Sequence, residues 1–423
     1  MSDMNQTPKG ERVHISIFGR RNSGKSSLIN ALTNQQLAIV SDVAGTTTDP
    51  VSKSMELLPI GPVVVTDTAG IDDVGELGQM RVEKTLRVLE STDVAVLMVE
   101  SCSKPGEWEE EIVSRVKERN LPLIVCAGKT DLCPDWSHIK SWATQHSVVF
   151  LAVSSMDGTG ILELKNTLGQ IAPASLEEPA LIGDLLSGGD IVVLVVPIDK
   201  AAPKGRLILP QVMTIRDILD HDAIAVTVKE RELRSCLESL GKPPKLVVTD
   251  SQAFLKVDAD TPKGTMMTSF SILMARYRGD LASFAAGAMA LDDLKPGDKV
   301  LMSESCTHHQ QADDIGRVQI PRWLRQAVGG ELDFTFASGR DFPTDVADYK
   351  LIVQCGGCMV NRREMLYRQR IAQAAGVPMT NYGVILAKVH GILERALEPF
   401  PMINISPRTT RKTLKVKLQR LGG

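Results

Sequence analysis

Three cysteines and a histidine in the C-terminal third of the chain have residue types and spacing that could hold a metal centre. Cys355 and Cys358 form a Cys-x-x-Cys hairpin directly after the apolar run 351–353, and Cys306 and His308 follow a second apolar run upstream. If both runs are neighbouring parallel strands, their carboxyl ends meet at one edge of a sheet and the sulfurs come together. Thiolate ligands suit zinc or an iron–sulfur cluster, and the spacing alone does not choose between them.

A second constellation lies near the N-terminus, where the stretch 19–26 matches G-x-x-x-x-G-K-[ST]. An apolar run precedes it and a helical run follows it, which is the strand–loop–helix context of a phosphate-binding loop. Backbone amides freed by the glycines close around phosphates, the lysine reaches the β- and γ-phosphates, and the last hydroxyl holds Mg²⁺. The predicted nucleotide-binding residues of this loop are Gly19, Asn22, Ser23, Gly24, Lys25, Ser26 and Ser27.

Two further motifs follow in the order typical of a GTPase. The stretch 45–49, Gly-Thr-Thr-Thr-Asp, resembles switch I of the TrmE and Era groups, and by that resemblance Thr47 completes the Mg²⁺ shell. The strand-like run 63–66 ends in D-x-x-G, so Asp67 would reach Mg²⁺ through water and the Gly70 amide would contact the γ-phosphate. Lys25, Thr47 and Gly70 are therefore the predicted catalytic residues.

Residue 71 is isoleucine, where many GTPases have a glutamine that orients the attacking water. An apolar side chain cannot do this, so hydrolysis needs other help. By resemblance to the same groups, Asn22 would help to bind K⁺, whose charge replaces an arginine finger. The alternative is an ordinary turn asparagine without an ion.

The base-recognition motif departs from the usual N-K-x-D, because the chain has Gly128-Lys129-Thr130-Asp131. Asp131 can still accept hydrogen bonds from N1–H and N2–H₂ of guanine, which excludes adenine. Gly128 lacks the side-chain amide of the usual asparagine, which normally braces this loop. We therefore expect specificity for GTP with weakened affinity. Ser154 and Ser155 are predicted to contact the base from a second loop.

Composition limits the remaining possibilities. The 423 residues are 43% hydrophobic and 23% charged with a net charge of −3, which gives no electrostatic reason to expect nucleic acid or an anionic membrane as partner. The seven cysteines are scattered, the N-terminus has no apolar signal segment, and no apolar run is long enough to span a bilayer. We expect a cytoplasmic protein whose cysteines are thiols or metal ligands.

Alternating strand-like and helix-like runs predict an α/β protein: a P-loop GTPase domain followed by two further parallel α/β domains. The predicted domains are a GTPase domain at 11–172, a dimerisation domain at 180–265 and a metal-binding domain at 266–423. The apolar periodicity of 266–291 predicts one long helix at the start of the third domain.

The chain resembles the FeFe-hydrogenase maturation GTPases, the HydF family, over essentially its whole length. The resemblance rests on the C-x-H and C-x-x-C motifs, which follow a TrmE/Era-like GTPase domain and an α/β middle domain. The resemblance implies that Cys306, Cys355 and Cys358 bind a 4Fe-4S cluster. It makes His308 the candidate exchangeable fourth ligand. Residue 354 is glutamine where many members have histidine, which leaves the fourth position to His308, to its neighbouring histidine, to water or to an exogenous ligand.

The same resemblance implies a function. The protein would bind GTP and GDP and act as a homodimeric scaffold that receives a two-iron precursor cluster from two radical-SAM maturases and delivers it to the FeFe-hydrogenase apoprotein. The alternative is a TrmE/Era-like GTPase of RNA modification or ribosome assembly with a structural zinc site. A basic tail at 408–420 is its only support in the sequence.

Overall fold

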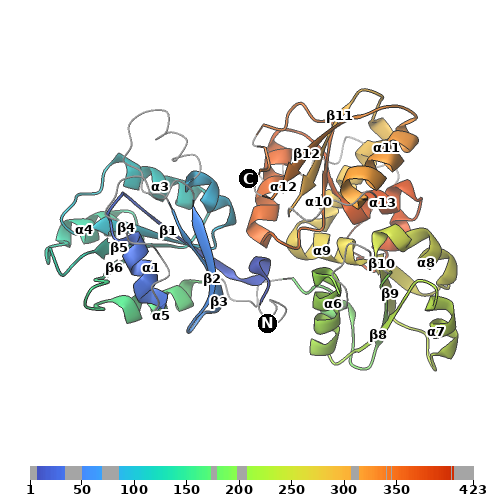
Figure 1. Ribbon diagram of the computed structural model, residues 1–423, viewed down its shortest axis with the longest axis horizontal. Helices are drawn as coiled ribbons and strands as arrows, with labels where there is room; N and C mark the ends of the chain where they lie inside the picture. The colour runs from blue at the N-terminus through green and yellow to red at the C-terminus, as the bar shows by residue number, and fades with distance from the viewer. Residues whose placement is uncertain are drawn as a thin grey trace. The chain divides into compact units, whose positions relative to one another are not determined.

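The structure is a computed structural model of the chain, and it describes residues 7–33, 50–68, 85–172, 179–197, 207–305, 314–339, 341–343, 345–401 and 403. The chain divides into two compact units, residues 1–177 and 178–423. Figure 1 shows both units, coloured from blue at the N-terminus to red at the C-terminus.

The first unit is built on a six-stranded sheet in the order β2-β3-β1-β4-β5-β6. Its central strands are nearly continuous apolar runs because helices cover both of their faces. β2 pairs with β3 in antiparallel orientation, and the other pairs are parallel. The strands are β1 (Val13–Gly19), β2 (Val51–Leu57), β3 (Gly61–Asp67), β4 (Val94–Glu100), β5 (Leu123–Gly128) and β6 (Val149–Ala152).

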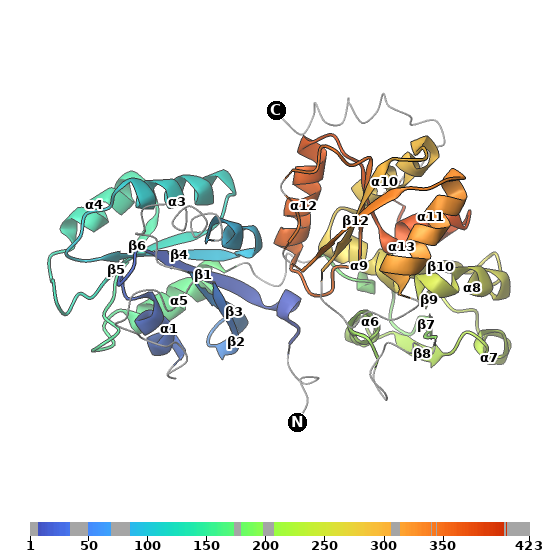
Figure 2. The ribbon, with the colours of Figure 1, turned by 45° about the horizontal axis from the view of Figure 1, so that its top comes forward.

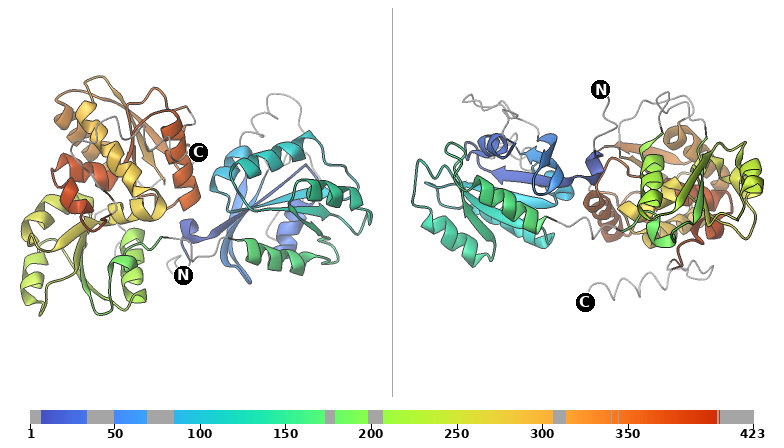
Figure 3. Two further views of the ribbon diagram at one scale, coloured as in Figure 1. Left: turned by 180° about the vertical axis from the view of Figure 1, so that it is seen from behind. Right: turned by 90° about the horizontal axis from the view of Figure 1, so that it is seen from below.

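Helices cover both faces of this sheet, and each face has its own apolar core. In Figure 2, α3 (Glu107–Glu118) and α4 (Ser137–Gln145) lie above the sheet, and α1 (Lys25–Thr33) and α5 (Ile161–Ile171) lie below it. Figure 3 shows the same layers from behind. Two short 3₁₀ helices, η2 (Lys9–Glu11) and η3 (Leu89–Ser91), precede β1 and β4.

The second unit begins with a four-stranded parallel sheet in the order β10-β9-β7-β8, which confirms the predicted parallel arrangement. The strands are β7 (Ile191–Val195), β8 (Ile224–Val228), β9 (Leu246–Thr249) and β10 (Met266–Ser269). The helices that accompany them are α6 (Leu209–Asp220), α7 (Leu233–Ser239) and α8 (Phe254–Asp260).

The prediction of one long helix over 266–291 was wrong. The segment begins as strand β10, continues as α9 (Phe270–Arg278), and breaks before α10 (Leu281–Ala288). The Ser269 side chain caps α9 by accepting a hydrogen bond from the Ile272 amide at 3.2 Å, and Asp280 caps α10 from the Ala282 amide at 3.1 Å. Each polar cap starts a new helix inside an apolar run.

A second four-stranded parallel sheet follows, in the order β12-β11-β13-β14. Figure 2 shows α12 and α11 on opposite sides of its strands. One continuous apolar core runs through both sheets of this unit, and no helix in the described part of the chain is long and apolar enough to span a membrane. The elements are β11 (Lys299–Glu304), α11 (Ile320–Val328), β12 (Asp333–Ser338), β13 (Leu351–Gln354), α12 (Arg362–Ala374), β14 (Met379–Asn381), α13 (Tyr382–Val389) and α14 (Leu393–Leu397).

Candidate nucleotide and metal sites

The loop between β1 and α1 has the backbone geometry of a phosphate-binding loop. Asn22 and Gly24 have positive φ angles of 59° and 95°, which turn successive amides toward one concavity. The buried Lys25 ammonium donates to the backbone oxygens of Gly19 at 2.8 Å and Arg20 at 2.7 Å. A Cβ atom at Gly19 would lie 2.5 Å from the Met98 carbonyl oxygen, so only glycine allows the loop to leave the sheet this closely.

Two of the three predicted Mg²⁺ residues lie side by side. The hydroxyl of Ser26, in the first turn of α1, donates to the carboxylate of Asp67, the last residue of β3, at 2.7 Å. Burial raises the pKa of Asp67, and the Ser26 hydrogen bond and the Lys25 charge oppose this. A buried carboxylate whose charge is costly is a good ligand for a divalent cation. Thr47 and Gly70 lie outside the described residues.

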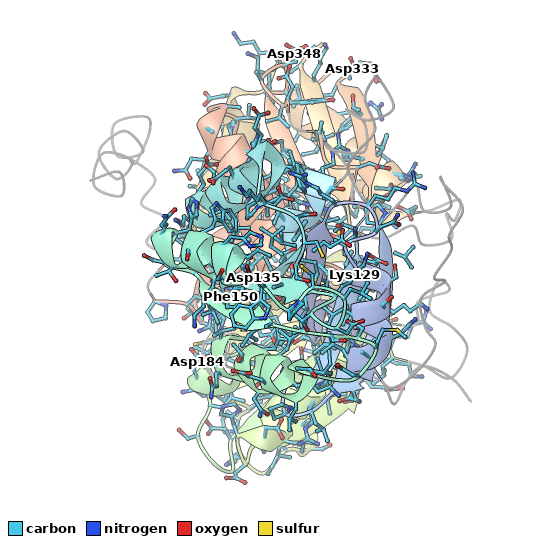
Figure 4. The ribbon with its side chains drawn as sticks, turned by 90° about the vertical axis from the view of Figure 1, so that its left-hand side faces the viewer. Lys129, Asp135, Phe150, Asp184, Asp333 and Asp348 are labelled. Carbon is cyan, nitrogen blue, oxygen red and sulfur yellow. The ribbon has the colours of Figure 1, made fainter. Side chains whose placement is uncertain are left out.

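The two predicted guanine-recognition loops are joined by a hydrogen bond. The Ser154 hydroxyl, fully buried, donates to the Asp131 carboxylate at 2.7 Å. The half-buried Ser155 follows it in the same loop. Lys129, labelled in Figure 4, has a positive φ of 59° and forms an ion pair with Glu100 at 2.9 Å. The carboxylate expected to read guanine is therefore held in place before any base arrives.

The structure gives a reason for glycine at position 128. A Cβ atom there would lie 2.6 Å from the end of the Met98 side chain and 3.1 Å from the Ser23 carbonyl oxygen. Met98 thus fills the space beside the phosphate-binding loop. The Ser23 hydroxyl is buried and has no hydrogen-bond partner within the described ranges.

At the other candidate site, the predicted convergence of two strand ends is confirmed. β11 and β13 are parallel neighbours, with Ser303 opposite Gln354. Beyond this register the Ser305 amide donates to the Cys355 sulfur at 3.1 Å. Cys306 and His308 lie outside the described residues, but the chain immediately before them contacts the first cysteine of the hairpin.

The Cys-x-x-Cys hairpin depends on a glycine. Gly357 has a positive φ of 70°, and a Cβ atom there would lie 2.4 Å from the end of the Met365 side chain. Cys355 and Cys358 are both half-buried. The Arg278 side chain, 1% exposed, passes 3.9 Å from that Cβ position. The atom in question is Cγ, so the aliphatic part of the Arg278 side chain packs against the hairpin.

Gln354 connects the first cysteine to a buried arginine. Its amide nitrogen donates to the Ser305 hydroxyl at 3.0 Å and to the Cys355 sulfur at 3.5 Å, and its oxygen accepts from Arg368 at 3.2 Å. Arg368 is 1% exposed and pairs with Glu364 at 2.5 Å. Sequence reasoning missed Arg368. The Glu–Arg pair at i,i+4 on the predicted helix indicates an ion pair but not its burial.

Comparison with protein families shows which family the chain belongs to. Residues 282–399 match the hydrogen maturase F tetramerization domain and residues 181–279 match the hydrogen maturase F dimerization domain, which together cover just over half of the chain. The chain belongs to the hydrogen maturase F family. Residues 14–129 match the family described as 50S ribosome-binding GTPase, so the first unit holds a P-loop GTPase domain.

Relatives outside the hydrogen maturase F family resemble only part of the chain. The tRNA modification GTPase MnmE of Endomicrobium trichonymphae is 35% identical over 170 residues, which is 38% of this chain and 36% of that protein. GTPase Der of Mycoplasmopsis agalactiae is 36% identical over 124 residues, 28% of each chain. A solved structure of Aquifex aeolicus Era bound to GDP and aluminium fluoride is 21% identical with a TM-score of 0.35, covering 54% of this chain and 98% of that one. The chain spans about a third of the length of the curated relatives that it matches.

The sheet edge matched by the hydrogen maturase F domains carries a further polar group that sequence reasoning missed. The Tyr382 hydroxyl and one Glu304 carboxylate oxygen are buried and have no hydrogen-bond partner within the described part of the chain. Arg317 pairs with the other Glu304 oxygen at 3.0 Å. Burial, and secondarily the charge of Cys355, raises the pKa of Tyr382 well above its usual value. Tyr382 is therefore a neutral donor beside the cysteine hairpin.

The residues present fit a cluster held by thiolates. The hairpin supplies two sulfurs, and the position after Ser305 would supply a third to the same edge. Backbone and side-chain donors already surround the Cys355 sulfur, as is usual for ligands of iron–sulfur clusters. Since Cys306 lies outside the described residues, no group of three His, Cys, Asp or Glu side chains that could hold a metal ion is found within them.

Proposed function

We propose that this protein is a GTP hydrolase and an iron–sulfur scaffold that receives a two-iron precursor and transfers it to apo FeFe-hydrogenase. Membership of the hydrogen maturase F family supports the maturation context. The observation that carries the proposal is the contact of the Ser305 amide with the Cys355 sulfur at 3.1 Å. It brings Ser305, the residue that precedes the C-x-H motif in the sequence, against the first cysteine of the C-x-x-C hairpin.

Cys306, Cys355 and Cys358 would hold a 4Fe-4S cluster through their thiolates. Such a cluster supplies an iron with one exchangeable position, to which a bridging ligand of a second metal fragment can attach and from which it can leave. His308 is the candidate for the exchangeable position. The two radical-SAM maturases supply the precursor, and the hydrogenase apoprotein receives it.

In the GTPase domain, Lys25 and the loop amides bind the phosphates and Asp131 selects guanine. Ser26 and Asp67 hold Mg²⁺, and Thr47 and Gly70 complete the hydrolytic site when GTP is bound. Asn22 contributes to a K⁺ site. The switch segments become ordered around the γ-phosphate, so this domain acts as a switch. The cluster chemistry takes place in the second unit.

The middle sheet supports a homodimer. β8 is one of the two edge strands of this sheet, and an edge strand exposes unpaired backbone groups. Ile224 on this strand is 48% exposed, and Val212 and Leu219 of α6 are 43% and 55% exposed. We assign this apolar edge to a second copy of the chain, because it lies within residues 181–279, which match the dimerization domain. We further propose a cytoplasmic location and three domains, 11–172, 180–265 and 266–423. β10, the first strand of the third domain, completes the sheet of the second.

Anaerobic purification followed by iron and sulfide assays and EPR tests the cluster. We expect about four irons and four sulfides per chain for a 4Fe-4S cluster, with a signal after reduction. Cys355→Ser should lose most of the iron and keep GTP hydrolysis. Cys236→Ser, a thiol on α7, serves as the matched control with unchanged iron. One zinc and no iron in the wild-type protein would overturn the proposal in favour of the alternative, an RNA-modification GTPase with structural zinc.

Transfer is tested by mixing protein loaded by the two maturases with apo-hydrogenase. Hydrogenase activity should appear with the loaded wild-type protein and be absent with loaded Cys355→Ser. Equal activity with both proteins would remove the scaffold role and leave the GTPase assignment intact.

A further inference from the structure

A buried carboxylate outside the motifs of the nucleotide site is tied to the phosphate-binding loop. The Arg20 guanidinium donates to the Glu109 carboxylate at 2.7 Å, across 89 positions of the sequence. Arg20 directly follows Gly19 in the loop, and Glu109 lies in the first turn of α3. The Glu109 side chain is 2% exposed, so its charge needs such a partner. The proposed function assigns no role to either residue.

The helix itself fixes where this carboxylate lies. The oxygen that accepts from Arg20 also accepts from the backbone amide of Gly106 at 2.8 Å, and Gly106 immediately precedes α3. Glu109 thereby satisfies one of the amides that a helix start leaves unpaired. A Cβ atom at Gly106 would lie 2.6 Å from the Arg20 Nη2 atom. Glycine at this position therefore leaves the space in which the guanidinium lies against the helix.

The backbone of Arg20 in turn holds the lysine of the loop. Its carbonyl oxygen accepts from the Lys25 ammonium at 2.7 Å and from the Ser23 amide at 3.3 Å. The Gly19 oxygen accepts from the same ammonium at 2.8 Å. Lys25, which is 7% exposed, is thus oriented in part by the residue whose side chain Glu109 anchors.

We propose that Glu109 is a positioning residue for guanine nucleotide binding, which through Arg20 keeps the phosphate-binding loop in its binding conformation before a nucleotide arrives. The inference rests on the proposed GTPase function. The loop needs such support because Asn22 has a positive φ of 59°, a region that costs energy for a residue other than glycine. Without the tether only a fraction of the molecules has the loop in this form. The apparent dissociation constant then rises by the inverse of that fraction.

The kinetic constants distinguish this role from two others. Bound phosphates hold the loop once the nucleotide is in place, so loss of a positioning residue raises KM and leaves kcat almost unchanged. Loss of a residue that acts only in the transition state lowers kcat and kcat/KM together. Loss of an ion pair that only stabilises the fold reduces the amount of active protein, which lowers the apparent kcat at an unchanged KM.

Steady-state GTP hydrolysis and a GDP titration of the full-length Arg20→Met variant test the inference. We expect KM for GTP and the dissociation constant for GDP to rise about tenfold, which corresponds to a correctly closed loop in about one molecule in ten, with kcat within about twofold of wild type. Arg20→Met/Glu109→Met should show no further rise, because the pair acts as a unit. Glu111→Met is the matched control, since Glu111 lies on the same helix and pairs with Arg115 at 3.3 Å at the surface, and both constants should stay at the wild-type value.

Gly106→Ala tests the geometry without removing either charge. The added methyl group occupies the space of the Arg20 Nη2 atom, and the flexible end of that side chain can move away without disturbing the fold. We expect a similar rise in KM. An unchanged KM in Arg20→Met or in Gly106→Ala, with or without a lower kcat, would overturn the inference, and additive effects in the double variant would overturn the role of Glu109. A wild-type protein that neither hydrolyses GTP nor binds GDP would instead overturn the proposed GTPase function, and this inference with it.

Discussion

The buried ion pair beside the cysteine hairpin makes a quantitative prediction for Arg368→Met. The Arg368 guanidinium is 2% exposed and pairs with Glu364, whose side chain is 9% exposed, at 2.5 Å. It also donates to the Gly339 backbone oxygen at 2.6 Å and to Gln354 at 3.2 Å. Methionine fills most of the same volume but satisfies none of these acceptors, so the Glu364 charge remains buried without a partner.

Breaking a buried pair by removing one partner costs about 3–5 kcal/mol, whereas replacing both partners by apolar groups is often nearly neutral. We therefore expect Arg368→Met to lower the free energy of unfolding of the second unit by about 3–5 kcal/mol. The double variant Arg368→Met/Glu364→Met should lose only about 1–3 kcal/mol, because the Gly339 and Gln354 oxygens still lack a donor.

Hydrogen exchange of the strand peptides of β11 and β13 in increasing urea measures this free energy in the second unit alone. Arg370→Met is the matched control, since Arg370 lies on the same helix and is exposed, and its free energy should stay within about 0.5 kcal/mol of wild type. A loss below about 1 kcal/mol for Arg368→Met would refute the reasoning from buried charge. Additive effects of the two methionine substitutions would refute the coupling of the pair.

Four other predictions concern the two candidate sites. GTP turnover should be faster in K⁺ than in Na⁺, and Asn22→Ala should remove the difference; equal wild-type rates in the two salts would exclude Asn22 from ion binding. Asp131→Ala should weaken GTP binding by about tenfold or more in a nucleotide titration, since two hydrogen bonds to a charged group are lost; unchanged affinity would place guanine recognition elsewhere. Burial raises the pKa of Asp67 in the folded protein. The neutral carboxyl group therefore contributes stability that is fully present below its unfolded-state pKa of about 4 and is lost as the pH rises through its folded-state pKa. Asp67→Asn should therefore raise the melting temperature of metal-free protein at pH 7 by roughly 2 °C or more, but not below about pH 4, and should abolish stabilisation by Mg²⁺; lower stability of the variant at pH 7 would contradict the burial argument. Gln354→Leu removes a donor to the Cys355 sulfur and should lower the reduction potential of the bound cluster in an EPR-monitored titration; an unchanged potential would show that the amide does not act on the sulfur.

The sequence was sufficient to predict the central strands of each sheet because those strands are covered on both faces. The run 351–353 is apolar throughout for this reason, and its parallel neighbour could be recognised in the same way. Edge strand β2 was not predicted, since its residues alternate between exposed and half-buried and carry polar side chains. Its extended form depends on pairing with β3, a contact that periodicity does not encode.

The error at 266–291 has a different cause. A short buried strand and a buried helix turn are both continuously apolar, so periodicity could not separate β10 from α9. The signals that could have done so were Ser269 and Asp280, two side chains that cap helices and that lie inside the run. A capping residue inside an apolar segment is good evidence that a new helix starts there. The apolar pattern is weaker evidence that one helix continues through the segment.

The cysteine motifs predicted where the second site lies, but not what surrounds it. The contacts of Arg368 with Ser303 and Gln354 join residues 65 and 14 positions apart, and only the packing of α12 against the sheet brings them together. A buried arginine on a predicted helix has the same local sequence pattern as an exposed one. Its role could therefore be read only from the folded chain.

These contacts also decide what the glutamine at position 354 can do. Its amide nitrogen has no lone pair available for a metal and already donates to Ser305 and Cys355. Its oxygen accepts from Arg368, so turning that oxygen toward an iron atom would leave a fully buried guanidinium without one of its acceptors. We therefore expect Gln354 to position the cysteine and not to serve as a ligand of the proposed cluster. We expect the exchangeable position of the proposed cluster to be filled by a group from outside this network: His308, its neighbour His309, water or an exogenous ligand.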